Sequence, residues 1–155
     1  MFEKKYGNDQ VEIMGHWSMV VKGPDGEVKQ TKSGKNVVVT NGLEYLASFM
    51  SSAACAAATF TQRYIAVGTD STAGAVSNTA LGTEVGRHTG TVSYTSGALY
   101  EVVATFAAGS ATGAIVEYGL LSANSGGTLF SRDIESVINV GASDTLEVTT
   151  KVTVG

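Results

Sequence analysis

Few side chains in this sequence are of types that could carry out acid–base catalysis. The chain contains only two histidines, His16 and His88, and proton-transfer chemistry needs titratable groups that converge in a pocket. The alternating pattern around His16 places it on the polar face of a strand, and His88 precedes the turn-forming pair Thr89-Gly90. We therefore expect both histidines to be exposed polar side chains and predict no catalytic residue.

Nucleophilic and metal chemistry are equally poorly supported. Cys55 lies in an alanine-rich tract with no basic or imidazole neighbour to activate its thiol, so we expect it to be buried and inert, and a lone cysteine forms no internal disulfide. The G-x-S-x-G pattern of a hydrolase nucleophile does not occur. Two histidines and one cysteine, far apart in sequence, do not make a zinc site. The sequence predicts no enzyme, no metal and no cofactor.

Two further kinds of ligand site, a phosphate loop and a calcium site, have little support in the sequence. Gly34-Lys35 resembles part of a phosphate loop, but Lys29 stands where the first glycine belongs and Asn36 where Ser or Thr belongs. Three aspartates, at positions expected to be turns, have the oxygen ligands that calcium prefers. Turn stabilisation is the commoner role of such residues, and we predict it here: they are Asp70, Asp133 and Asp144.

Composition sets the class of protein. The chain has 155 residues, of which 43% are hydrophobic and 15% charged, with a formal net charge of −4. This mixture is too apolar for general disorder, and the net charge gives no field that would hold nucleic acid or an anionic membrane. The start of the chain lacks the apolar stretch of a signal peptide, and no run approaches the length of a membrane span. We expect one β-rich domain made in a cytoplasm, with no nucleic-acid, membrane or small-molecule partner.

The first part of the chain predicts a hairpin followed by a helix. Apolar residues at odd positions over 11–21, Trp17 among them, indicate a strand with one buried face. The turn residues at 23–26 precede a second strand around 27–32. Asn41 and Glu44 have the spacing of a helix cap, which predicts a helix near 42–55 whose buried stripe comprises Leu43, Leu46, Ala47 and Met50.

Beyond residue 61 the pattern is that of an all-β protein. Apolar runs alternate with clusters of Gly, Ser, Thr, Asn and Asp, and a long loop of small residues is expected over 70–78. Together with the hairpin, these runs predict a two-sheet antiparallel β-sandwich of about eight strands, jelly-roll-like, with an N-terminal arm at 1–10 and a single domain at 11–155. The six later strands are expected at 62–69, 83–94, 98–108, 113–123, 127–133 and 144–154.

Charge is distributed unevenly along the chain. Residues 1–35 carry six of the seven lysines and a net charge of +1, whereas the rest of the chain has a net charge of −5. This asymmetry predicts either an arm and hairpin that dock onto an acidic surface or a solvated hairpin edge protected by lysines. If the segment docks, the contact residues are Lys4, Lys5, Tyr6, Lys29, Lys32 and Lys35.

Several short segments recur in a familiar order over residues 34–154. As a set they resemble small virion structural proteins of tailed bacteriophages. The segments are 34–43, 64–69, 78–85 with Arg87, 117–121, 129–132 and 144–146.

The resemblance implies a jelly-roll or related β-sandwich fold and a noncatalytic role in the virion. A capsid decoration, or cement, protein fits the small size of the chain. Such a protein binds the major capsid protein on the outer head surface as a homo-oligomer, usually a trimer, and stabilises the head. The alternative is a tail, fibre or baseplate component, possibly with a site for host-surface glycans.

Overall fold

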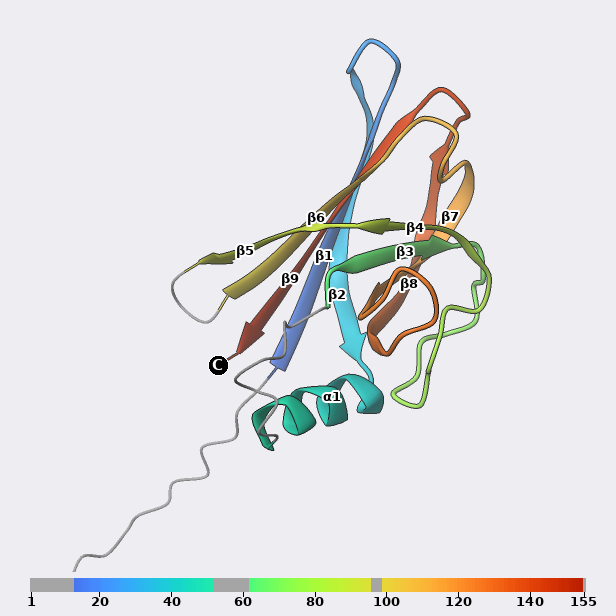
Figure 1. The fold of residues 1–155 in the computed structure, drawn as a ribbon. Helices are drawn as coiled ribbons and strands as arrows, with labels where there is room; N and C mark the ends of the chain where they lie inside the picture. Colours follow the sequence, from blue (N-terminus) through green and yellow to red (C-terminus); the bar gives the residue numbers. More distant parts are fainter. Residues whose placement is uncertain (1–12, 52–61, 96–98, 155) are drawn as a thin grey trace, which may run out of the picture.

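The computed structural model describes residues 13–51, 62–95 and 99–154. They form an antiparallel, mainly β structure with one short helix, which confirms the predicted fold class at that level (Figure 1). The elements are β1 (Ile13–Lys22), β2 (Val28–Val38), α1 (Thr40–Ser51), β3 (Tyr64–Gly68), β4 (Glu84–Thr89), β5 (Thr91–Thr95), β6 (Leu99–Phe106), β7 (Gly113–Leu121), β8 (Leu129–Val140) and β9 (Thr145–Val154).

The strands form one continuous sheet, so two separate sheets are not confirmed. Its order is β4-β3-β7-β8-β2-β1-β9-β6-β5. Strand β2 joins the two halves because it pairs with β1 over most of its length and with β8 at Val37 and Val38. Ser33 and Gly34, which follow the strand predicted around 27–32, lie within β2, opposite Ser18 and Trp17 of β1.

The predicted strand at 83–94 is two strands, which raises the count from about eight to nine. β4 pairs with β3, β5 pairs with β6, and Gly90 lies between them. A Cβ atom at Gly90 would lie 2.3 Å from a methyl carbon of Val102, so only glycine fits where the chain passes from β4 to β5. β4 and β5 are also the two ends of the strand order. Because these two edge strands follow each other in the chain, the sheet curls to bring its edges together. The result is a nearly closed, barrel-like sandwich (Figure 1).

The two halves share one hydrophobic core. Trp17, Met19 and Val21 of β1 are buried while His16 is exposed, as the alternation predicts. The Trp17 ring lies 6.2 Å from the ring of Tyr118 in β7, and its indole nitrogen donates to Asp133 of β8 at 2.6 Å. Trp17 is therefore a core residue with a satisfied polar atom.

Strand β8 is longer than the predicted 127–133. Its pairing with β7 is irregular between Ile115 and Glu117, where residues 135–137 of β8, all of them exposed, have only Val116 of β7 opposite them. The irregularity lets β8 continue to Val140 and keeps Ile138 in the core. A polar interruption in the sequence is therefore a bulge rather than the end of the strand.

Helix α1 begins at Thr40, before the predicted cap, and the Val39 carbonyl accepts from the amides of Gly42 and Leu43. Gly42 packs on β8, where a Cβ would lie 2.4 Å from the Phe130 carbonyl oxygen. Because this glycine faces the sheet, Leu43 is 45% exposed and the predicted buried stripe is wrong there. Ala47 is exposed as well, while the Met50 side chain and Cys55 lie outside the description. Among the described residues no helix has the length and apolar character that a membrane span requires.

Candidate functional site

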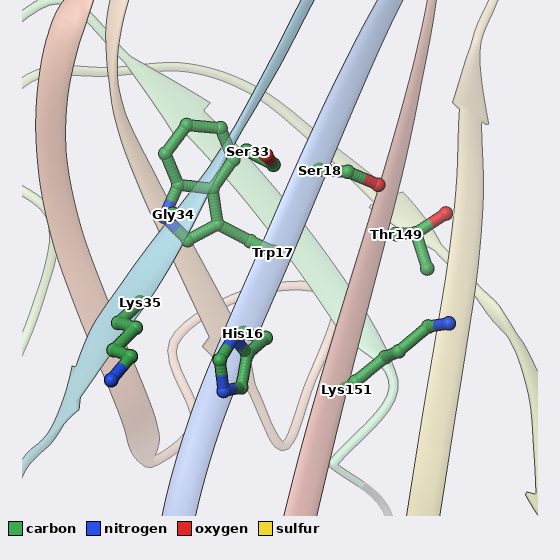
Figure 2. A pocket seen from close by; sticks show the side chains of 8 residues that line it. All are labelled: His16, Trp17, Ser18, Ser33, Gly34, Lys35, Thr149 and Lys151. Carbon is green, nitrogen blue, oxygen red and sulfur yellow. The ribbon is translucent and has the colours of Figure 1, made fainter.

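A shallow groove of about 330 Å³ lies on the outer face of β2, β1 and β9 (Figure 2). Strand register brings its side chains together, because His16 of β1 is paired with both Lys35 of β2 and Lys151 of β9. One step along, Ser18 is paired with Ser33 and Thr149. A row of basic side chains, here called the basic row (Lys35, His16, Lys151), thus runs beside a row of hydroxyls. The full lining is His16, Trp17, Ser18, Ser33, Gly34, Lys35, Thr149 and Lys151.

Gly34, which lines the groove, leaves room for the Trp17 ring. A Cβ atom at Gly34 would lie 3.0 Å from the Trp17 indole, and Figure 2 shows this indole beside Gly34. The glycine therefore leaves room for the large ring on the inner side of the sheet. His16 and Lys35 are exposed on the outer side.

The polar side chains that line the groove can donate hydrogen bonds to an acceptor-rich, negatively charged group. Ammonium and hydroxyl groups are the donors. The Lys151 ammonium lies 3.0 Å from a Glu101 carboxylate oxygen, and its side chain is 48% exposed; in Figure 2 it points away from His16, toward the neighbouring strand. A surface pair of this kind contributes little to stability, so Lys151 remains available to an external partner.

The predicted contact lysines of the hairpin lie in different surroundings. The Lys29 ammonium lies 2.9 Å from Asp144, and this hydrogen bond raises the pKa of Lys29 and lowers that of Asp144. The Lys32 ammonium donates to the carbonyl of Ser136 at 2.8 Å. These two lysines bond other parts of the same chain. Lys35 alone of the described set lies in the groove; Lys4, Lys5 and Tyr6 lie outside the described residues.

A second feature, a buried ion pair, was not predicted from the sequence. Glu117 of β7 is 0% exposed and Arg132 of β8 is 2% exposed. The Arg132 Nε atom donates to Glu117 at 2.7 Å, and its two terminal nitrogens donate to Asn78 at 3.0 Å and to Asp70 at 3.2 Å. The Glu117 carboxylate also accepts from the backbone amides of Gly82 and Thr83. We call Glu117, Arg132, Asp70 and Asn78 the clamp.

The clamp ties the loop at 69–83 to the sheet. Asp70, Asn78 and the amides of residues 82 and 83 all belong to this loop, and Thr69 closes it with a backbone bond to Thr83. A Cβ atom at Gly68 would lie 2.3 Å from a Glu117 oxygen, so a glycine is required for the carboxylate to fit. Each guanidinium nitrogen and each carboxylate oxygen has a partner in the same chain. The geometry therefore supports loop positioning as the role of these charges.

A signal for the clamp is present in the sequence but does not name its partners. Glu117 interrupts the apolar run from Ala114 to Leu121, and Arg132 follows Leu129 and Phe130. A charge inside a buried strand needs an opposite charge nearby. Which strands are neighbours is decided by the topology, and here β7 pairs with β8.

The three aspartates proposed as turn residues lie apart. Asp70 accepts from the amide of Thr72, and Asp144 accepts from the amide of Gly141, which confirms the turn role for both. Asp133 lies within β8 instead, where desolvation raises the pKa of its carboxyl while the Trp17 hydrogen bond opposes the rise. Within the described ranges no three acidic, histidine or cysteine side chains gather as a metal site would require.

The exposed side chains include apolar ones at the β5 edge of the sheet. Val92 is 42% exposed and Tyr94 is 77% exposed. His88 on β4 is exposed, as predicted, with its ring 5.9 Å from that of Phe106.

Comparisons with family models, curated proteins and solved structures return no match for this chain.

Proposed function

We propose that this protein is a noncatalytic structural component of a tailed-bacteriophage virion, a capsid decoration protein that binds the outer surface of the head and stabilises it. The resemblance of residues 34–154 to small phage virion proteins supports this proposal. The antiparallel β fold is in keeping with it. By jelly-roll-like we mean that antiparallel strands curl into two facing halves.

The observation that carries the proposal is the basic row beside the hydroxyls in the groove. Lys35, His16 and Lys151 come from three adjacent strands and face outward together. Charge complementarity favours an acidic partner and also speeds encounter with it. We propose that the groove receives an acidic segment of the major capsid protein. The docking role predicted for the lysine-rich hairpin thus moves to its outer face.

The number of copies per virion tests the role in the head. Quantitative mass spectrometry of purified particles should find the protein at an abundance close to that of the major capsid protein. Tens of copies at most would instead favour the tail, fibre or baseplate alternative, and binding of soluble host glycans would strengthen it. Absence from purified particles would contradict both.

Charge reversal tests the docking face. The Lys35→Glu and Lys151→Glu variants should each bind purified shells about tenfold more weakly than the wild type, because each removes attraction and adds repulsion. Lys22→Glu is the matched control, since it makes the same change on β1 in a residue paired with Thr145, away from the groove. Equal losses in all three variants would show that overall charge, and not the groove, governs binding.

The predicted homotrimer belongs to the same proposal. Native mass spectrometry of the protein released from particles measures it directly. Three copies per released complex would support a three-fold decoration unit.

A further inference from the structure

We infer that the β5 edge, residues Thr91–Thr95, is an assembly edge that pairs antiparallel with the same edge of a second copy of this chain. Among the described residues β5 has a neighbouring strand on one side only, because it ends the strand order. Its other side presents backbone N–H and C=O groups to a potential partner. Figure 1 shows β5 at the end of the β2–β1–β9–β6 half of the sheet.

The side chains of Val92 and Tyr94 in β5 lie on the core side of the sheet yet remain largely exposed. Val92 is paired with Val102 and Tyr94 with Tyr100 in the adjacent strand β6. Val102 is 0% exposed, whereas Val92 is 42% and Tyr94 is 77% exposed. Thr91 and Ser93 alternate with them. The strand therefore has the apolar and polar faces of a half-buried strand but extends past the core that would bury it.

The opposite edge of the same sheet is protected against pairing. Strand β4 carries Glu84, Arg87 and His88, and its register with β3 shifts between Val67 and Gly68. Charged side chains and bulges are the usual devices that keep an edge from joining another strand. β5 reads Thr-Val-Ser-Tyr-Thr and has no charge, proline or glycine. The contrast indicates that β5 is left open for a partner.

The sequence of β5 is complementary to itself, which is why we choose a second copy as the occupant. In an antiparallel register centred on Ser93, Val92 lies opposite Tyr94 of the second copy and Thr91 lies opposite Thr95. Pairs of an aromatic and a β-branched residue are among the favourable cross-strand pairs. No like charges meet, and the two-fold symmetry forms each apolar pair twice.

Five residues make a small contact. Stable interfaces bury about 800 Å² on each partner, more than one short strand supplies. The pairing is therefore dependent on concentration, weak in dilute solution and favoured where copies are held close together. It does not depend on the proposed role in the capsid, because a two-fold contact through β5 is separate from the three-fold contact of the proposed homotrimer.

Two double variants test the pairing and its register in the full-length protein. In Val92→Lys with Tyr94→Lys, lysines of the two copies lie opposite one another, so dimerisation should fall at least tenfold. In Val92→Lys with Tyr94→Glu, each lysine lies opposite a glutamate of the other copy, so dimerisation should be largely retained. Val76→Lys is the control, because Val76 is 60% exposed and lies in the loop at 69–83, away from β5.

Sedimentation equilibrium over about a hundredfold range of concentration measures the association. Association in the wild type and in the lysine–glutamate variant but not in the double-lysine variant would support the inference. A wild type that stays monomeric throughout would overturn it, as would equal association in all variants. Thermal unfolding by circular dichroism verifies that each variant is folded.

Hydrogen exchange distinguishes a second copy from a covering segment of the same chain. Alternate backbone amides of residues 91–95 should exchange quickly in dilute protein and slowly in concentrated protein. Slow exchange of all of them in dilute monomer would show that the chain covers its own edge, and would refute the pairing.

Discussion

The clamp and the β5 edge depart in opposite ways from the rule that apolar side chains are buried and charged ones exposed. At the clamp, Glu117 and Arg132 are buried, but every polar atom of their charged groups has a partner in the same chain. At the β5 edge, Val92 and Tyr94 are exposed and lack a cover among the described residues. The comparison shows buried charges that serve the internal construction of the fold, and exposed apolar side chains at the edge where we infer an external contact.

Substitutions in the two regions should also differ in their effect on the stability of the folded monomer. Removing one partner of a buried ion pair leaves the other charge desolvated and unpaired, which destabilises the folded state strongly. Changing an exposed side chain leaves the folded monomer almost unaffected. Stability should therefore respond to the clamp, and association to the β5 edge.

The largest effect is expected from breaking the clamp. Glu117→Leu should lower the free energy of unfolding by about 3–5 kcal/mol, because the Arg132 charge stays buried with fewer partners. Chemical denaturation measures the loss. The double variant Glu117→Leu with Arg132→Met should be more stable than Glu117→Leu alone, since no fully buried charge remains and Asp70, which loses its cation, is partly exposed. Glu101→Leu is the control: it breaks the exposed pair with Lys151 and should cost about 0.5 kcal/mol or less.

The next largest loss of stability is expected at Gly68, which leaves room for the Glu117 carboxylate. Gly68→Ala should cost about 2 kcal/mol, because its Cβ would lie 2.3 Å from Glu117 and 2.5 Å from the carbonyl oxygen of Thr83. Gly74→Ala is the matched control, since the nearest atom to its Cβ is 3.7 Å away. Denaturant midpoints of the two variants compare them directly. Equal midpoints would show that the loop adjusts and that the clamp does not need the glycine.

A pH profile tests a carboxylate at the turn that joins β8 and β9. Hydrogen bonds from Lys29 and the Gly141 amide hold the pKa of Asp144 below its ordinary value. A lowered folded-state pKa contributes stability above the unfolded-state pKa of about 3.9, and that stability is lost as the pH falls through the folded-state value. The stability advantage of wild type over Asp144→Asn should therefore be full near neutral pH and shrink below about pH 4.

Urea denaturation at a series of pH values measures this advantage. Asp25→Asn, which changes an exposed carboxylate in the turn between β1 and β2, controls for the general effect of charge. An advantage independent of pH would mean that Asp144 acts through shape alone.

The smallest change in stability is expected at the β5 edge. Tyr94→Ala should alter the free energy of unfolding by about 0.5 kcal/mol or less, because Tyr94 is 77% exposed. Tyr118→Ala is the matched variant in the core and should cost about 3–5 kcal/mol, because Tyr118 is 1% exposed. Thermal or chemical unfolding of dilute protein measures both. A large loss for Tyr94→Ala would place this side chain within the fold and count against an open edge.

Some elements were predictable because their signals are local. Alternation over β1 predicts Trp17 and Met19 in the core, where they lie, and the turn at 23–26 closes with a bond from the Gly26 amide to the Gly23 carbonyl. Each of these depends on residues close together in the chain. The helix was found for the same reason, although its first residue was not.

Other elements were not predictable because pairing between distant strands decides them. Glu117 and Arg132 are separated by 15 residues, and Lys29 and Asp144 by 115. The change of neighbour at Gly90, which separates β4 from β5, is visible only once the sheet has curled. The groove likewise requires His16, Lys35 and Lys151 to meet in one register row.

Local patterning was enough to establish an antiparallel, mainly β chain with one helix and its principal buried faces, because side-chain periodicity and turn chemistry act over a few residues. Tertiary structure alone decided that the strands form one curled sheet, that Glu117 meets Arg132 and that β5 is an edge strand among the described residues. The physical reason is that strand order and register arise from contacts distant in sequence, which no short segment encodes by itself.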